Sequence, residues 1–253
     1  KDGVAFYESR ILQHTTTPMK ADELHALGLS EVARIGTEID GLLNKLNLTG
    51  TTRAAKIKAL ELRASEQYPN NDEGRAQVLK DYQAIVEEIE AGLDSQFKTK
   101  PKAKMVVKRV PAFAEKGAPA AYYSSPSLDG SAPGVFYANL GNLAETSKFR
   151  MRTLSYHEGI PGHHMQIAIA QELKGLPIFR SLFGFTAYAE GWALYAERLA
   201  WEMGYIKTPG DDLGRLSDEM LRAVRLVVDT GIHAMGWSRE AAMIPAANTT
   251  RAT

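Results

Sequence analysis

The amino-acid sequence predicts a mainly α-helical chain with one small antiparallel β-sheet, an α+β fold. Over most of its 253 residues, apolar side chains recur at steps of three and four, as they do on one face of a helix. Between residues 98 and 140 this spacing gives way to short apolar runs separated by proline and glycine. Such runs are typical of strands joined by turns, so we expect the sheet to lie between two helical portions.

The first portion, residues 1–97, is expected to be a helical scaffold. A long apolar stripe runs from Asp22 to Leu48, and Thr51 or Thr52 is placed to cap the helix that follows. The spacing is again helical from Glu73 to Phe97.

The second portion, residues 98–253, is expected to hold the sheet and a helical region with the candidate site. The expected strands are Val106–Val110, Ala120–Ser124 and Gly134–Leu140. Helices are expected to resume near Ser147 and to cover residues 178–203, 212–235 and the chain from Ser238 onward.

The composition excludes several classes of function. Lys and Arg together number 30, as do Asp and Glu, so no net charge favours binding to nucleic acid or to an anionic membrane. The chain has no cysteine, which excludes disulfides and thiolate zinc ligands. No uncharged apolar stretch of about 18 residues predicts a membrane span, and the first residues lack the pattern of a signal peptide. The oligomeric state is left open.

The candidate site is a group of residues that bind metals. Three of the six histidines, His157, His163 and His164, fall within eight residues, and Glu158 follows the first of them. A hydrolytic zinc ion needs neutral imidazoles and a carboxylate as ligands, an open position, and a base beside it. We therefore expect one Zn²⁺ ion on His157, His163 and Glu190, with Glu158 as the general base.

The spacing departs from the usual motif His-Glu-x-x-His, in which two ligands lie one turn apart on a helix. The position four after His157 is Pro161, which cannot bind a metal and removes a helical hydrogen bond. A kink or a π-bulge is therefore expected, and two absorbed residues would bring His163 back under His157. His163 is preferred over His164 as the second ligand, and His164 would then contact the substrate or support the ligands.

Glu190 is the expected third ligand because it lies in an otherwise apolar segment. A carboxylate there is costly to bury unless it is paired or bound to a metal. Glu197 follows seven residues later on the same helical face, so we expect it to support a ligand or to form a salt bridge. Solvent-exposed polar residues on a turn are the alternative, which fits one histidine better than this group.

The pattern resembles the glutamate-ligand zinc peptidases, or gluzincins. Ala189–Tyr195 is similar to the Asn-Glu-Gly-Phe-Ala segment around the third ligand of zinc aminopeptidases. The stretched motif from His157 to His163 is similar to the lengthened version in dipeptidyl peptidase III. The resemblance implies a zincin-like metallopeptidase architecture.

Nearly the whole chain also resembles the bacterial family catalogued as domain of unknown function 885 (DUF885). The matching segments are His14–Thr17, Leu27–Leu29, Ser127–Gly130, Pro133–Tyr137, the histidine motif, Ala189–Trp192, Asp229–His233 and Gly236–Glu240. Members of that family are longer, so the resemblance implies one continuous catalytic domain that is part of a longer bacterial protein, periplasmic or cytoplasmic.

Further residues are candidates for contacts with substrate. Arg225, Asp229 and His233 step by four along one expected helix with apolar neighbours, which suggests a buried ladder, although a surface ladder of salt bridges is an equal alternative. We expect His233 to stabilise the oxyanion and Arg225 to bind a substrate carboxylate. Asp229 is expected to orient the His233 side chain or to lie near the metal.

Zinc peptidases of this type bind a peptide as an added strand on an exposed sheet edge. Gly134–Leu140 is the expected edge, and Tyr122, Tyr123 or Tyr137 could reach the oxyanion, although core packing is the better expectation for any one of them. Tyr123, Tyr137 and Asn139 are accordingly the candidates for substrate binding.

The sequence therefore predicts a zinc-dependent hydrolase that cleaves peptide bonds. One alternative is a zinc amidase that acts on a non-peptide substrate. Another is a non-catalytic helical binding protein that retains the motif for structure.

Overall fold

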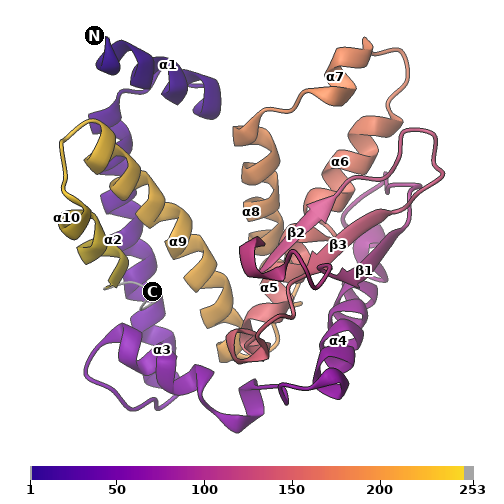
Figure 1. Cartoon of the computed structure of the whole chain (residues 1–253), viewed down its shortest axis with the longest axis horizontal. Coiled ribbons are helices and arrows are strands. Elements are labelled where there is room, and N and C mark those ends of the chain that lie inside the picture. Colours follow the sequence, from indigo (N-terminus) through magenta and orange to yellow (C-terminus); the bar gives the residue numbers. More distant parts are fainter. Residues whose placement is uncertain (1, 248–253) are drawn as a thin grey trace. The chain divides into compact units, whose positions relative to one another are not determined.

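The structure, a computed structural model, describes residues 2–247, apart from the side chains of residues 181–182 and 244–247. It confirms a mainly helical chain with a small sheet (Figure 1). The α-helices are α1 (Gly3–Thr15), α2 (Ala21–Lys45), α3 (Arg53–Glu61), α4 (Asp72–Glu90), α5 (Lys148–Glu158), α6 (His163–Glu172), α7 (Ile178–Leu182), α8 (Thr186–Glu202), α9 (Pro209–His233) and α10 (Arg239–Ala247). Short 3₁₀ helices cover Ala64–Glu66, Leu93–Ser95, Glu115–Gly117 and Leu143–Glu145. Among these described helices, none has both the length and the apolar character needed to cross a membrane.

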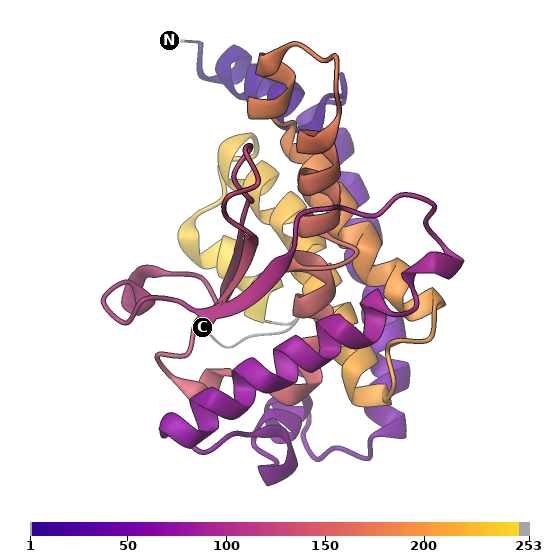
Figure 2. The ribbon, with the colours of Figure 1, turned by 90° about the vertical axis from the view of Figure 1, so that its right-hand side faces the viewer.

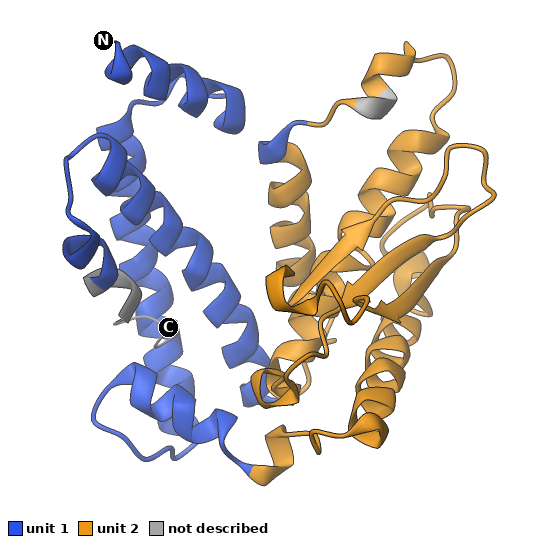
Figure 3. Ribbon diagram, in the orientation of Figure 1, with its two compact units in different colours: residues 1–63, 185–187, 208–253 blue, residues 64–184, 188–207 orange. Residues whose placement is uncertain are grey.

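The chain forms two compact units (Figure 3). Unit 1 contains residues 1–63, 185–187 and 208–253, and unit 2 contains residues 64–184 and 188–207. Residue 97, where the sequence pattern changes, lies within unit 2. Unit 1 joins the two ends of the chain because α9 packs closely against α2.

Unit 1 is built on the close packing of α2 and α9. The buried side of α2 carries Leu24, Ile35, Ile39 and Leu43, which recur at the helical period. At Gly28 the helices approach so closely that an added Cβ would lie 2.8 Å from the side chain of Val227. The next helix, α3, is capped by Thr52, whose hydroxyl accepts a hydrogen bond from the N–H of Ala55 at 3.1 Å. Of the two threonines that the sequence offered, the second is therefore the cap.

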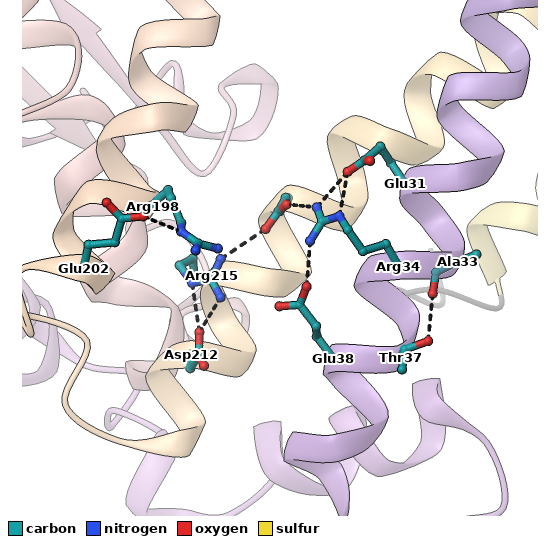
Figure 4. Close-up of polar contacts among 10 residues, drawn as sticks. Glu31, Ala33, Arg34, Thr37, Glu38, Arg198, Glu202, Asp212 and Arg215 are labelled. Atoms are coloured by element: carbon teal, nitrogen blue, oxygen red, sulfur yellow. Dashed lines mark hydrogen bonds and ion pairs between the residues drawn. The ribbon is translucent and has the colours of Figure 1, made fainter.

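A chain of charged residues fastens α2 to α9 (Figure 4). Arg34 on α2 binds Glu31 and Glu38 at 2.7 Å each and also contacts Glu219 on α9. Glu219 in turn accepts a hydrogen bond from the buried Arg215, at 3.1 Å. Because the side chain of Arg215 is only 3% exposed, this carboxylate offsets part of the cost of burying its charge.

Unit 2 contains the sheet, whose strands are β1 (Met105–Arg109), β2 (Ala121–Ser124) and β3 (Gly134–Ala138). Their order is β1-β3-β2, with β1 parallel and β2 antiparallel to β3. The sheet is therefore mixed, and the prediction of a purely antiparallel sheet is wrong. The prediction that Gly134–Leu140 forms an exposed edge is also wrong, since β3 is paired on both sides.

One face of the sheet packs against α4 and α5, and the turned view of Figure 2 shows α4 alongside the sheet. Phe136 is fully buried there, with its ring 5.0 Å from that of Tyr82 on α4. A second buried cluster joins α4 to the three helices α5, α6 and α8. Its members are Ile89, Leu93, Tyr156, Ile160, Met165 and Ala200. These contacts place α5, α6 and α8 side by side, and the candidate site lies on them.

The segment predicted as one helix over residues 178–203 forms two helices, α7 and α8. The interruption covers residues 183–185, in the middle of which lies Gly184. Glycine has the lowest helix propensity after proline, which favours a break at this position.

Candidate metal centre

His157, His163 and Glu190 come together in unit 2 from α5, α6 and α8. The Nε2 atoms of both histidines lie 3.6 Å from the Glu190 carboxylate, one near each oxygen. The imidazole rings are 4.8 Å apart and nearly perpendicular. One potential ligand atom from each residue therefore lies within 4.8 Å of the other two.

This arrangement fits a zinc ion. Ligands that lie about 2.1 Å from zinc at tetrahedral angles are about 3.4 Å from one another. Both distances from histidine to Glu190 already match this spacing. Two imidazoles and a carboxylate are also the donor set of zinc hydrolases, in which the fourth position stays open.

A second carboxylate orients His157. Glu197, seven residues after Glu190 on α8, is 2% exposed and has its Oε1 atom 2.7 Å from His157 Nδ1. An ionised carboxylate only accepts hydrogen bonds, so beside an ionised Glu197 the proton lies on Nδ1, which donates it. In the neutral ring the lone pair of Nε2 then faces Glu190, as metal-binding histidines require.

Glu190 itself is 57% exposed. The sequence argument that a buried carboxylate needs a metal or a partner therefore does not apply to it. That argument treated α8 as apolar on all sides, whereas only one side of the helix is buried, along Ala193, Ala196 and Ala200. The reason to consider Glu190 as a ligand is its position opposite the two Nε2 atoms.

The prediction of a kink or π-bulge inside one helix is wrong. Helix α5 ends at Glu158, a turn follows, and α6 starts at His163. The peptide bond before Pro161 in this turn is cis. Gly162 is required at the close of the turn, because a Cβ at that position would lie 2.0 Å from the carbonyl oxygen of His157. His163 thus approaches His157 from the first turn of a separate helix.

Glu158, the predicted general base, is the last residue of α5 and is 8% exposed. It directly follows His157 and lies beside the turn. Its role as the general base stays a prediction.

Trp192, which the sequence reasoning did not single out, holds the turn against α8. Its indole N–H donates a hydrogen bond to the carbonyl oxygen of Pro161, at 2.8 Å. Trp192 lies two residues after Glu190 on the same helix. This bond therefore links the carboxylate-bearing helix to the turn between the two histidines. Its place in the Ala189–Tyr195 segment was the available signal, but the contact spans 31 residues.

His164 does not join the converging residues. Its Nδ1 lies 2.8 Å from the Tyr123 hydroxyl, and its Nε2 lies 3.1 Å from the carbonyl oxygen of Ala103. Burial lowers the pKa of His164 and raises the pKa of Tyr123, and both shifts favour the neutral form. The structure thus places His163 rather than His164 opposite His157, as the sequence reasoning preferred.

Tyr137 and Asn139, also predicted to bind substrate, lie on and beside β3. Tyr137 stacks on Tyr122 of the neighbouring strand, with ring centres 5.0 Å apart. The Asn139 side chain donates hydrogen bonds to the carbonyl oxygens of Glu115 and Ala118, at 2.8 and 3.1 Å. These contacts fix the connection between β1 and β2, and a contact of either residue with substrate remains a prediction.

Arg225, Asp229 and His233 belong to unit 1, where they lie on the exposed side of α9. The side chains of Asp229 and His233 are 62% and 57% exposed and 3.7 Å apart, and Asp229 accepts a hydrogen bond from the Tyr7 hydroxyl at 2.7 Å. The argument for a buried ladder is therefore wrong. The buried side of this part of α9 is formed by Ala223, Val224, Val227 and Thr230. The roles predicted for the ladder remain predictions.

Comparison with known proteins identifies the family of the chain. Residues 1–251 match the family described as "Bacterial protein of unknown function (DUF885)". The chain belongs to this family. A comparison with curated protein sequences finds no match.

Two solved structures resemble this DUF885 chain. The "putative lipoprotein" from Colwellia psychrerythraea is 38% identical, with a TM-score of 0.95 over 98% of this chain. A "putative lipoprotein of unknown function" from Shewanella oneidensis is 20% identical, with a TM-score of 0.77 over 97% of this chain, and shows that the fold is shared. The chain spans 43% and 46% of the lengths of these two proteins.

Proposed function

We propose that this DUF885 chain carries the centre of a zinc-dependent hydrolase that cleaves peptide bonds. The observation that supports the proposal best is the convergence of His157, His163 and Glu190 at distances that suit a common ion. The bond from Glu197 to His157 adds to it, because it leaves the Nε2 lone pair facing the shared position. Resemblance of the motif to gluzincins agrees with this chemistry.

The chain's own residues then divide the work of hydrolysis. Zinc, when bound, supplies a Lewis acid that lowers the pKa of water at the open position to about 7. Glu158 would accept a proton from the water whose oxygen bonds to the carbonyl carbon, and would deliver it to the amine nitrogen as the C–N bond breaks, which leaves a carboxylic acid and a free amine. Glu197 keeps His157 in one tautomer and orientation throughout.

A peptide substrate would be bound along β2, which replaces β3 as the candidate edge. The Asn139 N–H donates to the carbonyl of Ala120, at 2.9 Å. Since alternate residue pairs are bonded in an antiparallel ladder, the backbone N–H and C=O groups of Ala121 and Tyr123 point away from β3. An extended peptide can pair with such groups. Tyr123 also contacts His164, next to His163, so this edge lies near the candidate centre.

The deciding experiment is the metal content of the purified protein by mass spectrometry. Wild type is expected to hold about one zinc ion per chain, and Glu190→Ala to lose it. Glu202→Ala is the matched control, because Glu202 is exposed on the same helix and pairs with Arg198. A wild-type protein that stays metal-free after zinc is supplied would overturn the proposal and favour a binding protein.

Hydrolysis is tested separately with Glu158→Gln. This variant is expected to retain zinc and to cleave a peptide library about 10²- to 10⁴-fold more slowly than wild type. Unchanged turnover would remove Glu158 from the mechanism. A zinc-loaded wild type that cleaves amides but no peptide would identify the amidase alternative.

The Colwellia relative is described as a putative lipoprotein. Of the two compartments that the sequence leaves open, we therefore propose the periplasm for the parent protein. Fractionation of the source bacterium with an antibody against this chain tests the proposal, and recovery in the cytoplasm would refute it.

A further inference from the structure

We propose that His164 is a positioning residue that fixes the position of His163 relative to the edge strand β2. The inference rests on the zinc-hydrolase function proposed above. It gives a role to His164, the one histidine of the His157–His164 motif that is not among the converging residues.

The two hydrogen bonds of His164 have a defined direction. The carbonyl oxygen of Ala103 can only accept, so His164 Nε2 must donate across the 3.1 Å between them. A neutral ring that carries its proton on Nε2 has an acceptor at Nδ1. The Tyr123 hydroxyl, 2.8 Å from Nδ1, is therefore the donor. The imidazole is fixed in one tautomer by two partners of opposite polarity.

This direction also determines what Tyr123 can do. Its only hydroxyl proton is used in the bond to His164, so Tyr123 cannot donate to a substrate oxyanion while that bond persists. The Tyr123 ring also packs edge-on against the His164 ring, with centres 5.6 Å apart. We therefore assign Tyr123 to the positioning of β2 and not to the reacting atoms.

The bonds of His164 connect three separate parts of unit 2. Ala103 lies just before β1, Tyr123 lies on β2, and His164 lies in the first turn of α6. The partners are 61 and 41 residues away from His164 in the sequence. Because His163 and His164 are consecutive on the same turn, a rotation of α6 that displaced His163 would break both bonds.

Gly134 leaves the space in which Tyr123 and His164 meet. A Cβ at this position would lie 2.7 Å from His164 Nδ1 and closer still to the Tyr123 hydroxyl. Contacts this short do not occur, so Gly134→Ala must displace the hydroxyl. The backbone of Gly134 does not need glycine for its φ angle, since its φ lies outside the left-handed region. Gly134→Ala therefore breaks the Tyr123–His164 bond while both partners remain in the chain.

The first test is independent of metal. Nitrogen-15 NMR of the metal-free protein, with His164 assigned through His164→Asn, is expected to show a neutral imidazole protonated on Nε2. Tyr123→Phe is expected to shift the Nδ1 resonance, because the nitrogen loses its donor. An imidazole protonated on Nδ1, or no change in Tyr123→Phe, would overturn the assigned direction of the bonds.

The second test measures the affinity for Zn²⁺ and for Co²⁺, whose visible spectrum reports ligand geometry. Tyr123→Phe and Gly134→Ala are each expected to weaken binding by about tenfold and to alter the cobalt spectrum. Ser124→Ala, which removes an exposed hydroxyl from the same strand, is expected to match wild type. Thermal unfolding of the metal-free proteins checks that each variant is folded.

Variants of His164 keep the test decisive if a substitution harms folding. Asparagine places an acceptor near the Nδ1 position, and glutamine places a donor near the Nε2 position. Each is expected to bind cobalt more tightly than His164→Ala. Equal affinity of all the folded variants and wild type would overturn the positioning role. A wild-type protein that binds neither cation would instead overturn the proposed function on which that role rests.

Discussion

Glu197→Gln tests whether the buried carboxylate on α8 acts through His157. Glu197 is 2% exposed and lies 2.7 Å from His157 Nδ1, on the side of the ring opposite Glu190. Glutamine keeps the size of the side chain but removes the charge that favours a proton on Nδ1. Loss of such a supporting carboxylate typically weakens metal affinity about 10- to 100-fold. The expected change is therefore about 1.4 to 2.7 kcal/mol in the free energy of zinc binding.

The assay is competition for zinc with a chromophoric chelator at constant pH. Glu202→Gln on the same helix, 48% exposed and paired with Arg198, is the matched control and is expected to bind as wild type does. Circular dichroism of both metal-free variants shows whether unit 2 is folded. A folded Glu197→Gln protein with wild-type zinc affinity would refute the reasoning, because the buried carboxylate would then not influence the ligand.

Two predictions concern stability. Gly231→Ala is expected to cost about 1 to 3 kcal/mol of unfolding free energy, because the new Cβ would lie 2.5 Å from the indole ring of Trp237. A Cβ added at Gly41 would have no neighbour within 4 Å, so Gly41→Ala is expected to raise the free energy of unfolding by about 0.5 to 1 kcal/mol. Urea unfolding that ranks the two variants in the opposite order would contradict this packing. Hydrogen bonds from Arg109, at 2.6 and 3.0 Å, lower the pKa of Glu115 in the folded protein. The stabilisation that they give is therefore present above the pKa of the unfolded chain, about 4.3, and is lost as the pH falls through the lower pKa of the folded protein. Glu115→Gln is expected to lower stability by up to about 1 kcal/mol at pH 7 and by less at pH 3, and an equal loss at both values would count against this pair.

The helices were predictable because their signals are local. The apolar stripe of α2 and the cap at Thr52 are each formed by residues three or four positions apart. The strands were predictable for the same reason. Their pairing was not, because nothing within a five-residue strand specifies which neighbour it will join or in which direction. The parallel alignment of β1 with β3 and the packing of α9 on α2 arise from contacts between residues far apart in the sequence.

The candidate site shows the same division. His157, His163 and Glu190 could be chosen as candidates from residue type and spacing, and the structure brings them together, while their role as metal ligands stays a prediction. The turn between the histidines was misjudged because Pro161 was weighed without Gly162, whose missing side chain is what allows the chain to pass the His157 carbonyl. Proline alone indicates a kink, whereas proline followed directly by glycine favours a complete turn.

The contacts that sequence reasoning missed share one property. Trp192 with Pro161, and His164 with Ala103 and Tyr123, pair a side chain with a group 31 to 61 residues away. Each connects one of the converging residues to a different part of unit 2: Trp192 anchors the helix of Glu190, and His164 anchors the turn of His163. A metal site assembled from three helices needs such connections, because no single helix fixes the distances between its ligands. The arrangement of His157, His163 and Glu190 therefore depends on how the rest of unit 2 packs around them.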